Sequence, residues 1–112
     1  MNMNDYQLQS QRTHPKANFY SKLSNYALGV VSESGEVADE LKKVIYHGHI
    51  LNVEEIEKEL GDVLHYVAGL ATFLELDMDT IAQKNIDKLK KRFPDGFSEE
   101  ASRNRVEYGS QK

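Results

Sequence analysis

Two prolines, Pro15 and Pro94, enclose a long interior segment of this 112-residue chain in which no further proline occurs. Because proline removes a backbone donor and clashes with the preceding turn, its absence leaves the interior open to long helices. Apolar residues recur there at steps of three and four, and no useful stretch alternates with period two. The sequence therefore predicts an all-α fold.

Two long helices follow from this periodicity and its stop signals. The first is expected over residues 17–46 and ends before Gly48, since glycine readily closes a helix. The second is expected over residues 53–74, because Asn52 followed three residues later by Glu55 resembles a capping pair. The short connector predicts that the two helices form an antiparallel hairpin.

A third helix and two polar ends complete the predicted domain organisation. The third helix is capped by Asp77 or Asp79, ends before Pro94, and is expected to turn inward Ile81, Ile86, Leu89 and Phe93. Residues 1–16 are polar and unpatterned, so we expect a flexible N-terminal arm with room for a short helical piece. Residues 17–97 form the domain, and residues 98–112 form a polar C-terminal tail.

Composition narrows the environment and the partners. With 39% hydrophobic residues the chain fills only a modest core, so we expect a homodimer or homotetramer that completes a multi-helix bundle. We expect a cytoplasmic protein without a membrane partner, because no apolar run suits a membrane span or a secretion signal. The net charge of -4 argues against nucleic acid as a partner. The lack of cysteine restricts metal ligands to oxygen and imidazole, which favours hard cations.

Each long helix carries a pair of acidic residues three positions apart, Glu33 with Glu36 and Glu59 with Asp62. At 100° per residue, the first acid of each pair falls roughly 80° and the second roughly 140° from the centre of the apolar stripe, to the same side. Glu36 and Asp62 are expected at the same level, roughly thirteen residues or about 20 Å from the middle of the connector. In an antiparallel hairpin all four carboxylates can therefore meet.

Four anionic donors at one edge repel one another unless a cation neutralises them. Mg²⁺ fits best, with Mn²⁺ as a substitute, because it prefers oxygen ligands and is commonly completed by substrate phosphates. Phosphoanhydride hydrolysis needs this arrangement together with a base that activates water, for which Glu36 and Glu59 are both candidates. Glu40 and Glu55 are expected to be surface acids, although Glu40 is near enough to serve as an outer ligand.

Other residues outside the carboxylate pairs also bear on the site. On the third helix, Asn85, Lys88 and Arg92 form one ridge that could grip phosphates or a sugar, and that otherwise is a solvated basic face. Gly35, inside the first helix, indicates close approach of another helix or of substrate, or else a tolerated accident. His65 projects roughly 160° from the core centre and is expected to be exposed.

The segments LGVVSESGEVADELKK, EIEKELGDVLHYV and NIDKLKKRFPDGF together resemble the MazG-like nucleotide pyrophosphohydrolases of the all-α NTP pyrophosphatase superfamily. The resemblance covers about residues 20–97. It implies hydrolysis of a nucleoside or deoxynucleoside triphosphate to the monophosphate and pyrophosphate, in homodimers or dimers of dimers. It also implies magnesium at the four carboxylates, and nucleotide contacts from the N-x-x-K-L-x-x-R segment that holds Asn85, Lys88 and Arg92.

The expected activity is therefore a magnesium-dependent nucleotide pyrophosphohydrolase that cleans the nucleotide pool. Three alternatives stay open at this point. A phosphoribosyl-ATP pyrophosphatase resembles the same superfamily. A helical module that binds nucleotide or metal for oligomerisation or regulation would show no turnover. A simple acidic bundle without a ligand would not be stabilised by magnesium.

Overall fold

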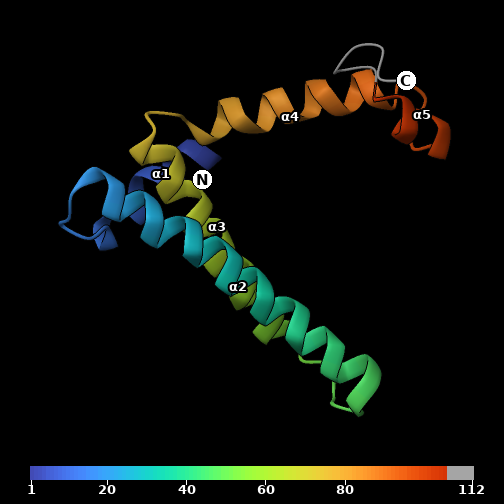
Figure 1. Ribbon diagram of the computed structural model, residues 1–112, viewed down its shortest axis with the longest axis horizontal. Helices are drawn as coiled ribbons and strands as arrows, with labels where there is room; N and C mark the ends of the chain where they lie inside the picture. Colours follow the sequence, from blue (N-terminus) through green and yellow to red (C-terminus); the bar gives the residue numbers. More distant parts are fainter. Residues whose placement is uncertain (106–112) are drawn as a thin grey trace. The chain divides into compact units, whose positions relative to one another are not determined.

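The computed structural model describes residues 1–105, and the regular elements within that range are all helical (Figure 1). In chain order they are α1 (Met3–Ser10), the 3-10 turn η1 (Gln11–Thr13), α2 (Phe19–His47), α3 (Val53–Phe73), α4 (Met78–Arg92) and α5 (Glu99–Asn104). The chain divides into two compact units, residues 1–77 and the part from Met78 onward. The predicted all-α class is confirmed.

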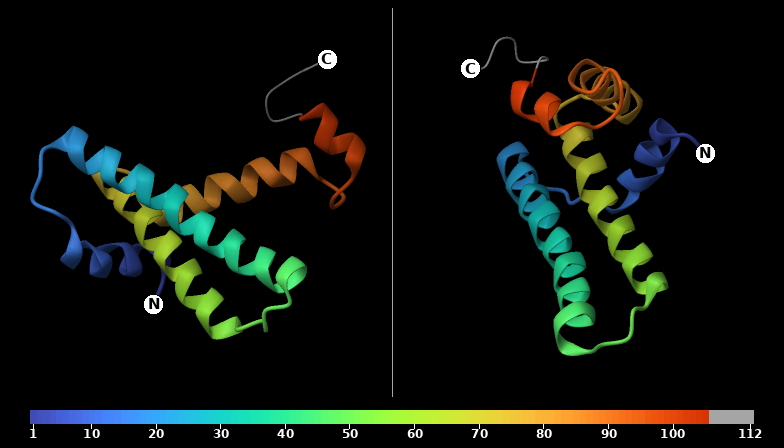
Figure 2. Two further views of the ribbon diagram at one scale, coloured as in Figure 1. Left: turned by 60° about the horizontal axis from the view of Figure 1, so that its bottom comes forward. Right: turned by 90° about the vertical axis from the view of Figure 1, so that its right-hand side faces the viewer.

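The first unit is built on the hairpin of α2 and α3, which lie side by side and antiparallel in all views (Figure 2). The side chain of Asn18 caps α2 by accepting from the backbone N–H of Ser21 at 2.8 Å. Gly48, with a φ of 73°, ends α2 in the left-handed conformation that glycine adopts without a Cβ penalty. Asn52 then caps α3, as its spacing to Glu55 predicted.

The two helices approach closely through a reciprocal exchange of tyrosine and glycine. Tyr26 of α2 packs where Gly69 of α3 has no side chain, and Tyr66 of α3 packs where Gly29 of α2 has none. A Cβ at either glycine would collide with the opposing aromatic ring. Tyr26 is only 3% exposed, so it belongs to the core. The apolar residues at steps of three and four from which the first helix was predicted do not include it. The same Tyr-x-x-Gly spacing thus occurs once in each helix.

The N-terminal segment contains more order than the expected flexible arm. Its helix α1 packs against α3 (Figure 1). Gln7 is buried, and its side-chain amide donates to Thr72 Oγ1 at 3.0 Å and to the backbone carbonyl of Leu76 at 2.9 Å. A buried amide without partners would cost its full desolvation free energy. The two hydrogen bonds of Gln7 therefore anchor α1 on α3.

The second unit contains α4 and the short α5. The apolar side chains of α4 expected to face inward are mostly uncovered: Ile81, Ile86 and Leu89 are exposed, while Phe93 is half-buried. The helix that α4 contacts within its unit, α5, has only six residues and is too short to cover that face. Ser98 caps α5, so the predicted polar tail begins with a helical turn, and residues 106–112 of that tail lie outside the described residues.

Few side chains are buried in this structure. Among the described residues, the buried hydrophobic side chains are Tyr26, Ala68, Ala71 and Met78. Large apolar residues are exposed on the hairpin helices, including Leu28 at 66% and Val31 at 71%. A single chain therefore leaves much of its apolar surface in contact with water. In residues 1–105, no helix combines the length and the apolar character of a membrane-spanning segment.

Candidate active site

The hairpin places acidic residues of α2 opposite acidic residues of α3. Glu33 lies within electrostatic reach of Asp62, and Glu36 lies within reach of Glu59. These pairs continue the register of the tyrosine and glycine contacts, because the two members of every pair are equally distant from the junction of residues 47 and 48. The structure therefore brings the four predicted carboxylates onto one side of the hairpin, which we call the carboxylate rim and define as Glu33, Glu36, Glu59 and Asp62.

The pairing differs by about one helical turn from the expected level of Glu36 with Asp62. The cause is the asymmetry of the turn. In the observed register the end of α2 extends beyond the level at which α3 begins, and the connector returns alongside it. Residues that face each other are therefore not equally distant from the middle of the connector. Sequence spacing alone could not reveal this offset.

Glu33 is half-buried at the inner edge of the rim, as its smaller angular offset predicted, whereas Glu36 is exposed. Burial raises the pKa of Glu33 above its ordinary value, with further contributions from the negative charges of Glu36 and Asp62 and from a hydrogen bond with Glu36. One oxygen, Oε2, is inaccessible to solvent and has no hydrogen-bond partner among the described residues. Such an orphaned carboxylate oxygen is suited to an ion or to a proton donor.

Glu59 occupies the corresponding place on α3. It is half-buried, and its Oε2 also lacks both solvent and a partner within residues 1–105. Burial raises the pKa of Glu59 to about 7, helped by a hydrogen bond with Glu40 and by the negative charges of Glu40, Glu36 and Glu55. Glu40 is half-buried as well and is part of this cluster, so it is not a simple surface acid, and it lies near the rim, as its place on the same ridge allowed.

The carboxylates of the rim lack basic partners in the described part of the chain, where none of the four forms an ion pair with lysine or arginine. Lys58, next to Glu59 in the sequence, is paired instead with Glu55 at 3.3 Å. Lys43 is paired with Asp39 at 2.8 Å. The carboxylates consequently repel one another. Burial and this repulsion together raise the pKa values of Glu33 and Glu59.

The residues of the rim fit a hard divalent cation by their chemistry. All the donors are carboxylate oxygens, and two of those oxygens are buried without a partner. As the side chains stand within residues 1–105, no three His, Asp or Glu groups are already gathered around a single point. Binding would therefore require side-chain rotation, which exposed Glu36 and Asp62 are free to make because neither is packed in the core.

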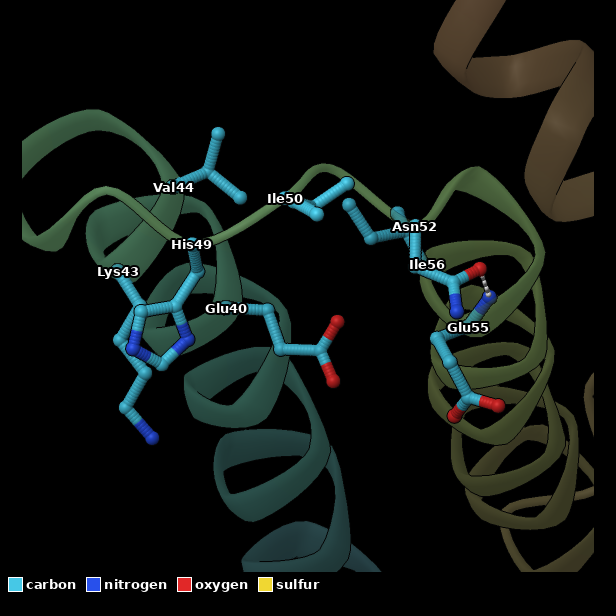
Figure 3. A pocket seen from close by; sticks show the side chains of 8 residues that line it. All are labelled: Glu40, Lys43, Val44, His49, Ile50, Asn52, Glu55 and Ile56. Carbon is cyan, nitrogen blue, oxygen red and sulfur yellow. Dashed lines mark hydrogen bonds between the residues drawn. The ribbon is translucent and has the colours of Figure 1, made fainter.

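A pocket of about 250 Å³ adjoins the rim at the turn of the hairpin (Figure 3). Glu40 from α2 and Glu55 from α3 line it, beside the connector residues His49 and Ile50. Figure 3 shows the carboxylate of Glu40 directed toward the gap between the helices. The pocket therefore extends the acidic side of the hairpin by one more pair in the same register.

The three predicted substrate-binding residues belong to α4, in the other compact unit. Asn85 is exposed, while Lys88 and Arg92 are half-buried. The guanidinium of Arg92 lies 5.9 Å from the ring centroid of Phe93, and Arg92 also lines a pocket of about 490 Å³ formed with residues 94–104. The expected ridge is thus present on α4 as a local feature.

His65 is not the exposed residue that its angular position suggested. It is half-buried, and its Nε2 lies 3.2 Å from the hydroxyl of Tyr26 in a hydrogen bond. Its ring also contacts Tyr66 at 5.3 Å between centroids, and His14 packs edge-on against Tyr26. The expectation was wrong because the hydroxyl of Tyr26 on α2 and the ring of His14 after η1 both lie against His65. Gly35, in contrast, has no neighbour within 4 Å of the place where a Cβ would stand.

Comparison with known proteins agrees with this arrangement. The family model of the MazG nucleotide pyrophosphohydrolase domain matches residues 21–97, which include α2 from its third residue, all of α3 and α4, and all four rim residues. The chain is also 38% identical over 87 residues to the "Gene 37 protein" of Mycobacterium phage L5, across 74% of this chain and 76% of that protein. No solved structure matches the chain. The chain belongs to the MazG nucleotide pyrophosphohydrolase family.

Proposed function

We propose that this protein is a magnesium-dependent pyrophosphohydrolase that converts a nucleoside or deoxynucleoside triphosphate and water to the monophosphate and pyrophosphate. One observation carries the proposal. Two helices deliver matched carboxylates to one side of a hairpin, and within residues 1–105 no lysine or arginine forms an ion pair with them and two of their oxygens are buried without a partner. Within a family of nucleotide pyrophosphohydrolases, a divalent ion that carries a triphosphate is the ligand that satisfies such a site.

The rim residues take distinct parts in this proposal. Glu33, Glu36, Glu59 and Asp62 would hold Mg²⁺, or Mn²⁺ in its place, which supplies positive charge against the phosphates when it is bound. Glu36 and Glu59 are the candidates for the base that accepts a proton from the attacking water. The α-β anhydride then breaks, and pyrophosphate leaves. Asn85, Lys88 and Arg92 would contact the nucleotide through hydrogen bonds and positive charge.

Self-association forms part of the same proposal. On α2, one ridge at steps of three and four carries small or apolar residues that are all exposed: Leu28, Val31, Gly35, Ala38, Leu41 and Ile45. The open space beside Gly35 allows the backbone of a second helix to approach. A homodimer or homotetramer would cover this ridge, and removal of unwanted nucleotides from the cytoplasmic pool is the role we assign to the assembly.

The direct test is a panel of nucleoside triphosphates, including dUTP, dCTP, oxidised nucleotides and phosphoribosyl-ATP, assayed for pyrophosphate release with Mg²⁺. Glu59→Gln and Asp62→Asn are expected to lower the rate by about 100-fold or more while the protein stays folded. Glu57→Gln, an exposed acid on the same helix outside the rim, is the matched control and should retain the wild-type rate.

The outcomes separate the alternatives. Turnover confined to phosphoribosyl-ATP would assign the protein to that activity, and absence of pyrophosphate with every substrate would leave a non-catalytic binding module. Mg²⁺ is expected to raise the melting temperature, since a ligand that binds only the folded state must do so. A melting temperature indifferent to Mg²⁺, together with unimpaired rim variants, would overturn the assignment of the site.

A further inference from the structure

A second pocket of the first unit lies where α1 and η1 meet α3. It measures about 340 Å³ and is lined by Met1, Tyr6, Gln9, Ser10, Arg12, Thr13 and His65. We call it the arm pocket. All its lining residues belong to the unit of residues 1–77, and six of the seven come from the N-terminal arm. Nothing in the chemistry described so far uses these residues.

The arm pocket adjoins the carboxylate rim. His65 follows Asp62 by three residues in α3, so the two lie about one turn, or roughly 4.5 Å of rise, apart on neighbouring positions of one helix face. Tyr6 lines the pocket together with His65 and lies within electrostatic reach of Asp62. Burial raises the pKa of the Tyr6 hydroxyl, and the negative charge of Asp62 raises it further. A ligand held at Asp62 can therefore extend into this pocket.

The walls of the arm pocket suit a flat heterocycle rather than a phosphate. The aromatic rings of Tyr6 and His65 line the pocket, and the hydrogen bond between His65 and Tyr26 fixes one of those rings in place. The hydroxyl of Ser10 is already engaged with the carbonyl of Gln7. Gln9 and Arg12 supply an amide and a guanidinium that can hydrogen-bond to the edge of a base or to a sugar.

We propose that the arm pocket receives the base and sugar of the nucleotide, with the Tyr6 ring as a stacking surface, while the phosphates lie at the carboxylate rim. This inference rests on the proposed function for the position of the phosphates. It assigns the N-terminal arm to substrate selection, since the residues that would touch the base come from α1 and η1. The volume is at the lower end of the range for small-molecule sites and suits a nucleoside.

Binding measured without turnover tests the inference. Isothermal titration with Mg²⁺ would compare α,β-imido deoxynucleoside triphosphates of each base with inorganic tripolyphosphate, which has neither base nor sugar. Tyr6→Ala is expected to weaken the best nucleotide analogue by about tenfold or more and to leave tripolyphosphate within about twofold. Tyr6→Phe keeps the ring and should bind like wild type. Tyr20→Ala, a tyrosine that is 79% exposed at the start of α2, is the matched control.

A second variant guards against a simple loss of structure. Arg12→Ala should also weaken the nucleotide analogue and spare tripolyphosphate, and circular dichroism should show both variants folded. Equal losses for both ligands, or no loss for either, would overturn the arm pocket. If the protein hydrolyses nucleotides but Tyr6→Ala leaves binding of the analogue unchanged, only the arm-pocket inference is overturned. A protein that binds analogues through Tyr6 without releasing pyrophosphate from any substrate would lose only the proposed function.

Discussion

Glu59 stands where burial and three other carboxylates act on a single side chain. Glu40 hydrogen-bonds to it, and Glu36 and Glu55 add negative charge. Burial and these neighbouring carboxylates raise the pKa of Glu59 to about 7, so in the absence of a cation Glu59 takes up a proton at a pH at which an ordinary glutamate is ionised.

This proton makes stability depend on pH. The pKa of Glu59 is about 7 in the folded chain and 4.5 in the ordinary state, so between these values the folded chain binds more protons than the unfolded chain. The free energy of unfolding must then decrease as the pH rises from about 4.5 through 7. Glu59→Gln keeps the side chain neutral, so its melting temperature should exceed that of wild type at pH 8 and match it at pH 4.

The same measurement contains its own control. Glu57→Gln changes one exposed charge on the same helix and should leave the pH profile of the melting temperature unchanged. Mg²⁺ should reduce the difference between wild type and Glu59→Gln at pH 8, because the ion supplies the positive charge that the proton supplied. A wild-type profile as flat as that of Glu59→Gln would contradict the clustering of these acids.

The rim could be predicted at the residue scale because helix geometry is local. A rotation of 100° per residue fixes which side chains share a face, and two like doublets on antiparallel helices then converge. The environment of His65 and the contact of Glu40 with Glu59 were not predictable in this way. Both depend on partners from other elements: Tyr26 on α2 and His14 after η1 lie against His65, and Glu40 on α2 faces Glu59 on α3.

At the scale of elements, the tyrosine and glycine contacts set the distance between α2 and α3. Gly29→Ala places a methyl group against the ring of Tyr66 and should destabilise the fold by about 1–3 kcal/mol, the usual cost of overpacking a core. Gly61→Ala is the matched control. It lies mid-helix with nothing within 4 Å, so it should be neutral or stabilising by up to about 1 kcal/mol.

Chemical denaturation of both variants checks this expectation. The midpoint should fall for Gly29→Ala and should hold or rise for Gly61→Ala, with the slope unchanged in each. Equal effects from the two substitutions would show that only helix propensity is being measured and that the helices are not in close contact at Gly29.

Helix ends were predicted well where caps and periodicity coincide. The predicted spans 17–46 and 53–74 correspond to α2 (Phe19–His47) and α3 (Val53–Phe73), and α4 ends before Pro94 as expected. Helix α1 was not resolved by periodicity, since its polar sequence has no apolar stripe. Its signal was the capping box of Asn2 and Asp5. What fixes α1 on the hairpin is the buried Gln7, a contact between residues more than sixty positions apart that no local pattern encodes.

At the scale of the whole molecule, the proposed self-association is the main expectation that a single chain does not satisfy. It rests on the exposed ridge of α2. Val31→Asp would place a charge in the middle of the interface that we propose, where an unpaired buried charge is strongly unfavourable. Size-exclusion chromatography with light scattering should then shift from a dimer or tetramer toward the monomer mass. Ser32→Asp adds the same charge at the neighbouring exposed position and should keep the wild-type mass. A monomeric wild type would remove the assembly from the proposal.

The matched register of the hairpin limits how the chain can vary in length. The two tyrosine–glycine contacts and the two pairs of facing rim acids join residues equally distant from the junction of residues 47 and 48, so inserting or deleting one residue in either helix would displace every such pair beyond that point at once. Each displaced side chain would also rotate by about 100° around the helix axis. The tyrosines would then no longer face the glycines, and the acids of one helix would no longer face those of the other. The connector bears no such constraint, because lengthening a loop costs little entropy. Among relatives of this chain, changes in length between the two doublets should therefore fall in the turn and not in the helices.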